Sequence, residues 1–157
     1  MELWSWKLEL KNIKIFMSNL FVLSHFVVLL FALFLVFSGF LMYFKPENVR
    51  TIISKAGSTY LINYTELAIR LFIGIAFYIV SLFSIYQLFF SVFGYFLIVS
   101  ALLLMFVPIK THNQFSRKAS AFLKPNYLKF VAPISIIFGL LLLLIIYKQI
   151  QSLINLY

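Results

Sequence analysis

The residues that could carry chemistry are few, and the first is an arginine at the edge of an apolar stretch. Arg70 directly precedes a long run without formal charge, and Glu66 lies four positions before it. Residues at this spacing share one helix face, so we expect an ion pair. An ionisable residue inside a membrane span is by default a candidate functional site. If the helix starts near Tyr64, however, Arg70 is only about 9 Å inside it and can extend to the interface.

The two histidines are the other candidates. His25 lies in the first apolar stretch and could be a proton relay or a ligand, but no second His, Asp or Glu shares that stretch to hold a metal. We therefore favour a hydrogen bond from His25 to another helix. His112 lies among polar and basic residues, where a cationic or headgroup-contact role and simple solvation are both open.

Recognisable catalytic motifs are missing from the sequence. It contains no G-x-S-x-G elbow, no P-loop, no H-E-x-x-H and no embedded aspartate pair. It also contains no cysteine, which excludes disulfides, thiolate metal sites and cysteine nucleophiles. We expect a protein that is not an enzyme and that has no catalytic residue, cofactor or metal site.

The composition indicates that these residues are positioned by membrane-spanning helices. Of 157 residues, 64% are hydrophobic and 11% are charged, against roughly 45–50% and 25% in soluble domains. We predict a single all-α membrane domain over residues 1–157 with about four transmembrane helices arranged as two hairpins. The predicted spans are about 19–44, 64–83, 88–107 and 128–147, and the basic connectors are 45–63 and 108–127.

Charge-free runs and prolines set these boundaries. Residues 19–44 carry no formal charge and exceed the roughly 20 residues needed to cross the hydrocarbon. Residues 71–107 are also uncharged and too long for one crossing, so the chain must turn back near the polar segment Ser84–Gln87. Pro46 and Pro108 follow the first and third spans. Asn63 and Glu66 resemble a capping box at the start of the second span.

The chain ends and the helix packing carry further expectations. Residues 1–17 have an apolar stripe and three lysines on another face, which predicts an amphipathic helix at the membrane surface. Glycine is scarce, so we expect loose or partner-assisted helix packing. In the fourth span, Pro133 and Gly139 could mark a broken helix, but a tolerated proline and a packing contact are the favoured interpretation.

A shift of 62 positions aligns residues 31–61 with residues 93–123 without a gap, and 10 of the 31 positions are then identical. Shared Leu and Phe inflate such a comparison, so the discriminating pairs are Ser38 with Ser100, Pro46 with Pro108, and the Ser-basic pair Ser54-Lys55 with Ser116-Arg117. A tandem repeat and chance similarity both remain open. In a repeat, each unit would contain two crossings, and both units would have the same orientation.

Basic residues predict the orientation. Nine of the 13 lie in or beside the two connectors, which places the connectors in the cytoplasm. The lysines before the first span argue the other way. We expect a multi-pass protein of the bacterial inner membrane. The nine residues are Lys45, Arg50, Lys55, Arg70, Lys110, Arg117, Lys118, Lys124 and Lys129.

The expected function is that of a non-enzymatic accessory or scaffold subunit in a larger membrane complex. Bulky apolar helices and short connectors leave interaction as the main role, with other membrane subunits and anionic phospholipids as partners and no nucleic acid. The alternative is a small transporter, channel or lipid-handling protein, and the basic connector faces could also be only an orientation signal. The lipid or partner contact candidates are Arg50, Lys55, Glu66, Arg70, His112, Arg117, Lys118 and Lys124.

Overall fold

The computed structural model describes the backbone of residues 2–154 and the side chains of residues 9–152. Within this part the chain forms six helices and no strands. Four of the helices, α1, α3, α4 and α6, are long and apolar enough to cross a membrane, which suggests a membrane location. The elements are α1 (Glu2–Phe44), α2 (Pro46–Ser54), α3 (Tyr60–Ser81), α4 (Gln87–Phe106), α5 (Ile109–Phe122) and α6 (Pro125–Ile154).

Prolines mark three of the helix starts. Pro46 and Pro125 are the first residues of α2 and α6, and Pro108 caps the N-terminus of α5. Proline suits these positions because the first N–H groups of a helix have no partner within the helix. Pro133 lies inside α6, which nevertheless continues to Ile154, so the broken-helix alternative for the fourth span does not hold.

The long charge-free run folds back between α3 and α4. The turn covers residues 82–86, and the Ser84 hydroxyl accepts a hydrogen bond of 3.1 Å from the backbone N–H of Tyr86. A hydroxyl that bonds the backbone two residues on stabilises a turn without glycine or proline. The polar segment at Ser84–Gln87 therefore lies at the fold-back.

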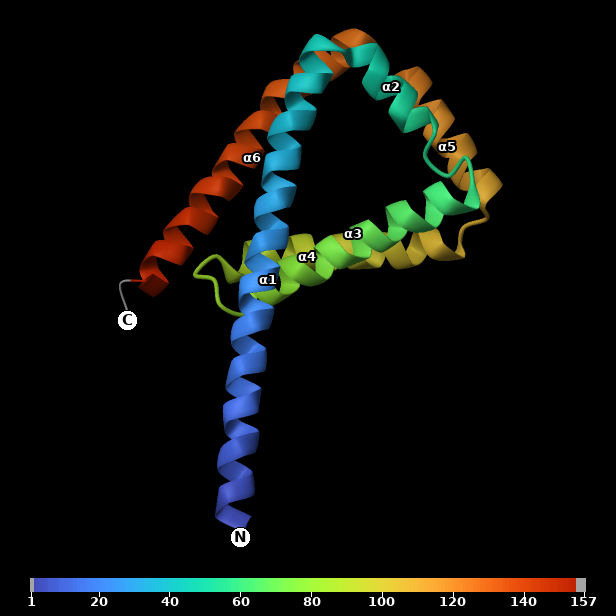
Figure 1. Cartoon of the computed structure of the whole chain (residues 1–157). Helices are drawn as coiled ribbons and strands as arrows, with labels where there is room; N and C mark the ends of the chain where they lie inside the picture. The colour runs from blue at the N-terminus through green and yellow to red at the C-terminus, as the bar shows by residue number, and fades with distance from the viewer. Residues whose placement is uncertain (1, 155–157) are drawn as a thin grey trace.

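Helix α1 is one uninterrupted helix of 43 residues. At 1.5 Å per residue it is about 65 Å long, roughly twice the thickness of the hydrocarbon core. Its N-terminal part extends away from the other helices (Figure 1). The surface helix expected over residues 1–17 is continuous with the first span instead of forming a separate element, and the side chains of residues 1–8 lie outside the described part.

The helices pack in three pairs. Helix α1 lies along α6, α3 along α4, and α2 along α5, and the pairs form the sides of a triangle (Figure 1). This pairing differs from the predicted hairpins of consecutive spans. Helix α2 carries the chain from the α1/α6 pair to the α3/α4 pair, and α5 carries it back. At 14 residues, α5 is about 21 Å long and acts as a spacer between the two pairs.

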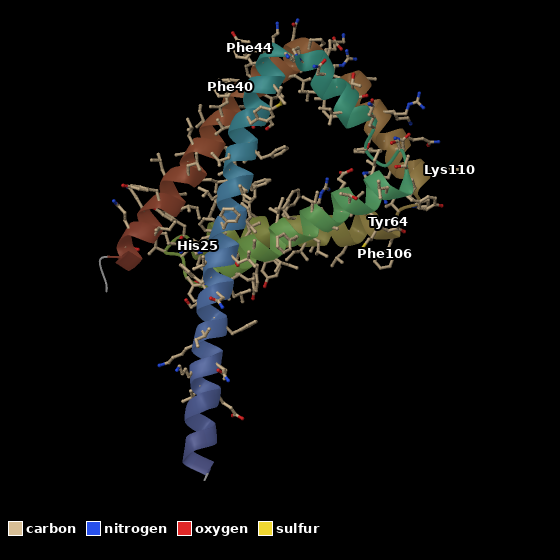
Figure 2. The ribbon with its side chains drawn as sticks, in the orientation of Figure 1. His25, Phe40, Phe44, Tyr64, Phe106 and Lys110 are labelled. Atoms are coloured by element: carbon tan, nitrogen blue, oxygen red, sulfur yellow. The ribbon has the colours of Figure 1, made fainter. Side chains whose placement is uncertain are left out.

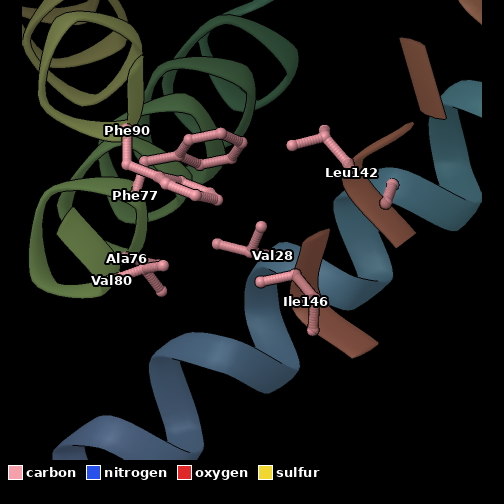
Figure 3. Packing of buried hydrophobic residues seen from close by; sticks show 8 residues of the cluster. Val28, Ala76, Phe77, Val80, Phe90, Leu142 and Ile146 are labelled. Carbon is pink, nitrogen blue, oxygen red and sulfur yellow. The ribbon is translucent and has the colours of Figure 1, made fainter. Parts of the chain in front are cut away.

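One apolar cluster joins the two long pairs. Val28 of α1 contacts the α3/α4 pair, where the rings of Phe77 and Phe90 lie 5.8 Å apart (Figure 3). Leu142 and Ile146 of α6 complete the cluster from the other side. These side chains belong to the part of α3 and α4 near their turn, so the pairs meet at that end and diverge toward the connectors (Figure 1).

Glycines bring the helices of each long pair into close contact. A Cβ atom added to Gly139 would lie 2.8 Å from the Ala32 carbonyl oxygen, and one added to Gly94 would lie 2.8 Å from the Tyr78 nitrogen. Gly39 and Gly74 face their partner helices at similarly short range. The expectation of loose packing was therefore wrong within the pairs, because four of the few glycines are concentrated at these two interfaces.

Candidate functional site

The connector helices α2 and α5 are joined by polar side chains at both ends. Arg50 of α2 donates from Nε to the Ser120 carbonyl oxygen at 3.0 Å. Asn113 of α5 donates from Nδ2 to the carbonyl oxygens of Ser54 and Ala56 at 3.2 and 2.8 Å. Each helix thus caps carbonyl groups at the end of the other, and the pair is antiparallel.

A sharp turn follows α2 and fits against α5. Gly57 has a φ of 66°, which side-chain-bearing residues rarely adopt. A Cβ atom there would lie 3.0 Å from His112 Nδ1 and 3.1 Å from the Asn113 nitrogen. The turn therefore needs glycine both for its backbone conformation and for the approach of α5.

His112 is buried at the junction of α3 and α5. Its Nδ1 donates to the amide oxygen of Asn63 at 2.6 Å, and only 5% of His112 and 2% of Asn63 is exposed. This arrangement differs from the solvated histidine considered from the sequence. An amide oxygen can only accept a hydrogen bond, so Nδ1 of His112 is the donor in this bond. Nε2, the other ring nitrogen, takes no part in it.

The cap of α3 corrects a sequence expectation. Helix α3 begins at Tyr60 with Thr59 as its N-cap, and the Thr59 hydroxyl accepts from the backbone N–H of Ile62 at 3.2 Å. Asn63 was predicted to be the N-cap but lies inside the first turn, where its side chain bonds His112 instead. Threonine is a preferred N-cap residue, because its hydroxyl can accept a hydrogen bond from a backbone N–H in the first turn of the helix. Thr59 is therefore itself a sequence signal for the start of α3.

A pocket of about 810 Å³ lies where α3 meets the connector pair. Most of its wall is apolar, and its polar groups come from α3, α5 and the end of α2. Such a volume falls in the range of about 300–1,000 Å³ that is typical of small-molecule sites. The lining residues include Ile52, Lys55, Ile62, Thr65, Glu66, Ile69, Arg70, Leu104, His112, Phe115, Ser116 and Ala119.

The ion pair predicted from the sequence lies in this wall. Arg70 Nη2 donates to Glu66 Oε1 at 3.0 Å, and both side chains are about one-third exposed. A pair within one helix that is about one-third exposed contributes little stability, on the order of 0–1 kcal/mol. Its importance here is that it places charged groups in a pocket whose wall is mostly apolar.

Four of the eight contact candidates meet in the pocket, namely Lys55, Glu66, Arg70 and His112. Arg50 instead joins α2 to α5 and pairs with Glu47 at 2.8 Å. Arg117, Lys118 and Lys124 do not line it. Figure 2 shows Tyr64 and Phe106 at the connector end of the α3/α4 pair, with Lys110 near the start of α5.

Sequence reasoning missed the roles of three residues that shape the site: Asn63, which it assigned to a helix cap, Asn113 and Gly57. All three act between segments far apart in the chain. Only the glycine gave a local signal of its actual role, because Lys55-Ala56-Gly57-Ser58 is typical of a helix end followed by a turn. Ser116 lies four residues after His112 and lines the same pocket. Its pairing with Ser54 in the aligned segments gave no indication of this position.

The polar groups of the pocket can bind a ligand through charge and hydrogen bonds. Among the described residues, no hydrogen bond joins His112 to a hydroxyl group, and its orienting partner is an amide and not a carboxylate. No group of three His, Asp or Glu side chains in the described part could hold a metal ion. The pocket offers an apolar wall with cationic and hydrogen-bonding groups.

A second buried polar cluster lies near the α3–α4 turn. His25 Nδ1 donates to the Phe21 carbonyl oxygen at 2.8 Å, and the Gln149 side chain of α6 neighbours the ring. Gln149 Nε2 donates to the Phe83 carbonyl oxygen at 3.1 Å and so ties α6 to the turn. His25 Nε2 and Gln149 Oε1 are buried without a partner among the described residues. Gln149 of α6 is thus the neighbour on another helix with which the hydrogen bond expected for His25 could form, although the two side chains do not reach hydrogen-bond geometry in the described part.

The sequence matches no protein-family model, and the searches of curated proteins and of solved structures found no match either.

Proposed function

We propose that this chain is a non-enzymatic accessory or scaffold subunit of a larger membrane complex, which packs against partner helices and anionic lipid. The observation that carries this proposal is the divergence of the two helix pairs. They meet at one apolar cluster near the α3–α4 turn and are held apart at the other end by α2 and α5 (Figure 1). The described part of the chain leaves apolar side chains on the flanks of both pairs uncovered.

Large apolar side chains are exposed on these flanks. Phe37 of α1 is 60% exposed, Phe72 of α3 is 54% exposed and Ile137 of α6 is 58% exposed. In a membrane such faces contact acyl chains or other helices, and aromatic side chains provide large contact areas for a partner. The two diverging pairs present such faces in two directions, which suits a subunit that joins neighbours.

We also propose the finer features of the architecture. The connectors lie in the cytoplasm of a bacterium, with the α3–α4 turn outside, because the connector end holds most of the basic residues. The units α1–α2–α3 and α4–α5–α6 are tandem repeats. In such a repeat α1 corresponds to α4 and α3 corresponds to α6, so the α1/α6 pair corresponds to the α3/α4 pair. Ser38 and Ser100 also occupy equivalent positions, and each hydroxyl donates to the carbonyl oxygen three residues earlier at 3.0 Å.

Site-specific photo-crosslinking in native membranes tests the scaffold role. A photoreactive residue at Phe37 or Phe72 should yield one dominant protein adduct of constant mass, and the adduct protein should co-elute in stoichiometric amount after extraction in mild detergent. The same residue at Phe16, in the N-terminal half of α1 and 65% exposed, is the matched exposed control. A lone stable monomer with only lipid adducts at Phe37 and Phe72 would contradict the proposal.

A small lipid-handling membrane protein is the second candidate, because the pocket combines an apolar wall with Arg70 and Lys55. It differs from the first candidate in requiring lipid to move and not only to bind. Transfer of labelled lipid between vesicle leaflets or between vesicles by the isolated chain would favour it, and Arg70→Leu should then abolish that transfer.

A further inference from the structure

The connector pocket has the composition expected for a site that holds one amphiphilic molecule. Its apolar side chains come from four helices and include Ile52 of α2, Ile69 of α3, Leu104 of α4 and Phe115 of α5. They can cover an acyl chain, because burial of apolar surface is favourable wherever it removes contact with water. The volume of about 810 Å³ accommodates a head group and the first part of a chain rather than a whole lipid.

The charges in the wall favour an anionic head group. Lys55 and Arg70 contribute two positive charges and Glu66 one negative charge, which leaves an excess of one positive charge. Arg70 uses one of its five N–H donors on Glu66, so others remain for a ligand oxygen. No ion pair of Lys55 is found among the described residues. Phosphate oxygens are the acceptors that such donors bind most strongly.

Buried polar groups supply a second contact for the head. His112 is 95% buried, and the bond from its Nδ1 to Asn63 leaves Nε2 as the ring's remaining polar atom. Ser116, on the next turn of α5, also lines the pocket. A hydroxyl-bearing head group could donate to Nε2 and accept from Ser116, whereas a choline head group has no hydrogen-bond donor.

The position of the pocket points to the membrane as the source of the ligand. It lies at the end where α3 begins and α4 ends, beside the basic helix α5. Basic side chains next to the ends of membrane spans lie at headgroup depth. A phospholipid of the adjoining leaflet therefore has its phosphate at the level of Lys55 and Arg70 and its acyl chains on the apolar side.

We propose that the pocket formed by α2, α3 and α5 binds one anionic phospholipid, with Lys55 and Arg70 on the phosphate and His112 and Ser116 on a head-group hydroxyl. This inference rests on a membrane location and is independent of any partner subunit. It gives the anionic lipid in the proposed function a defined site. Lipid that merely surrounds a basic protein would show no dependence on the pocket residues.

Native mass spectrometry of the detergent-purified full chain tests the inference. The chain is titrated with phosphatidylglycerol or with phosphatidylcholine carrying the same acyl chains. We expect one phosphatidylglycerol molecule to bind at about tenfold lower concentration than phosphatidylcholine, a difference of about 1.4 kcal/mol. The double variant Lys55→Gln, Arg70→Gln should remove that preference.

A matched control distinguishes lipid binding in the pocket from general attraction of anionic lipid to a basic protein. The double variant Arg117→Gln, Lys118→Gln removes the same charge from α5 but outside the pocket lining, and it should keep the preference. Ala119→Trp fills the pocket without a change of charge and should weaken binding of both lipids. Arg70→Lys should retain most of the binding, which shows that the site tolerates replacement when the cation is kept.

Two results would overturn the inference. One is an equal loss of phosphatidylglycerol binding in the pocket double variant and in the control double variant, which would show that binding depends only on the total positive charge. The other is unchanged binding in Ala119→Trp. Circular dichroism and gel filtration of each variant verify folding, and Arg70→Lys and Ala119→Trp keep the test decisive if the double pocket variant does not fold. Neither outcome depends on a partner subunit, so this experiment and the crosslinking test of the scaffold proposal can fail independently.

Discussion

His112 and Asn63 lie 49 positions apart and are joined by a buried hydrogen bond of 2.6 Å from Nδ1 to Oδ1. The bond fastens α5 to the first turn of α3, and His112 lines the connector pocket. Burial makes it costly to break, because a donor left without a partner loses its solvation without compensation.

We therefore expect Asn63→Ala to destabilise the protein. The substitution leaves His112 Nδ1 buried without an acceptor, at a cost of about 1–3 kcal/mol. Thermal unfolding in detergent, followed by circular dichroism, should show a lower midpoint. Asn126→Ala, at an exposed position in α6, is the control and should stay near wild type. Equal midpoints for the two variants would show that the bond does not hold the junction.

Gly57→Ala should also lower the midpoint. Alanine at a φ of 66° costs about 1–2 kcal/mol, and its Cβ would press against His112 Nδ1 at 3.0 Å. The neighbouring exposed Ser58→Ala introduces the same side chain without either problem. A midpoint for Gly57→Ala equal to that of Ser58→Ala would contradict the turn geometry.

The close approach of α1 and α6 predicts that Gly139→Leu is poorly tolerated. Overpacking of this kind costs about 1–3 kcal/mol, because the side chain would enter the backbone of α1 near Ala32. Ala68→Leu, on an exposed face of α3, adds similar bulk where there is room. Gel filtration and thermal unfolding compare the two variants. Similar monodispersity and midpoints would mean that α1 and α6 do not pack as described.

The two buried histidines should respond differently to the same substitution. His25→Phe removes the unpartnered Nε2 and should leave stability unchanged or raise it by about 1 kcal/mol. His112→Phe breaks the bond to Asn63 and should lower stability. Thermal unfolding of both variants decides between them. A marked loss in His25→Phe would show that Nε2 has a partner in the protein as purified, such as a group from another subunit.

Features that depend on neighbours in the chain could be predicted from the sequence. Charge-free runs identify segments that cannot remain in water, and the spacing of Glu66 and Arg70 predicts their ion pair because both lie on one helix face. Proline at positions 46, 108 and 125 marks helix starts for a similarly local reason, the lack of an N–H donor.

Features that depend on distant segments could not be predicted. The sequence does not indicate that α1 packs on α6, because apolar side chains are present on all sides of both helices and give no preferred face. Asn63 resembles a cap, and only the approach of His112 explains its position inside α3. The glycines were too few to indicate close packing, because their effect depends on which residues they face.

Labelling of single cysteines tests the central claim, that α3 crosses the membrane between the connectors and the α3–α4 turn. The natural chain has no cysteine, so Ser58→Cys and Ile85→Cys each give one reactive site, and Ile85 is 90% exposed. With a membrane-impermeant maleimide, we predict that Ile85→Cys reacts in intact spheroplasts and Ser58→Cys only in inverted vesicles. Reaction of both from the same side would contradict the account.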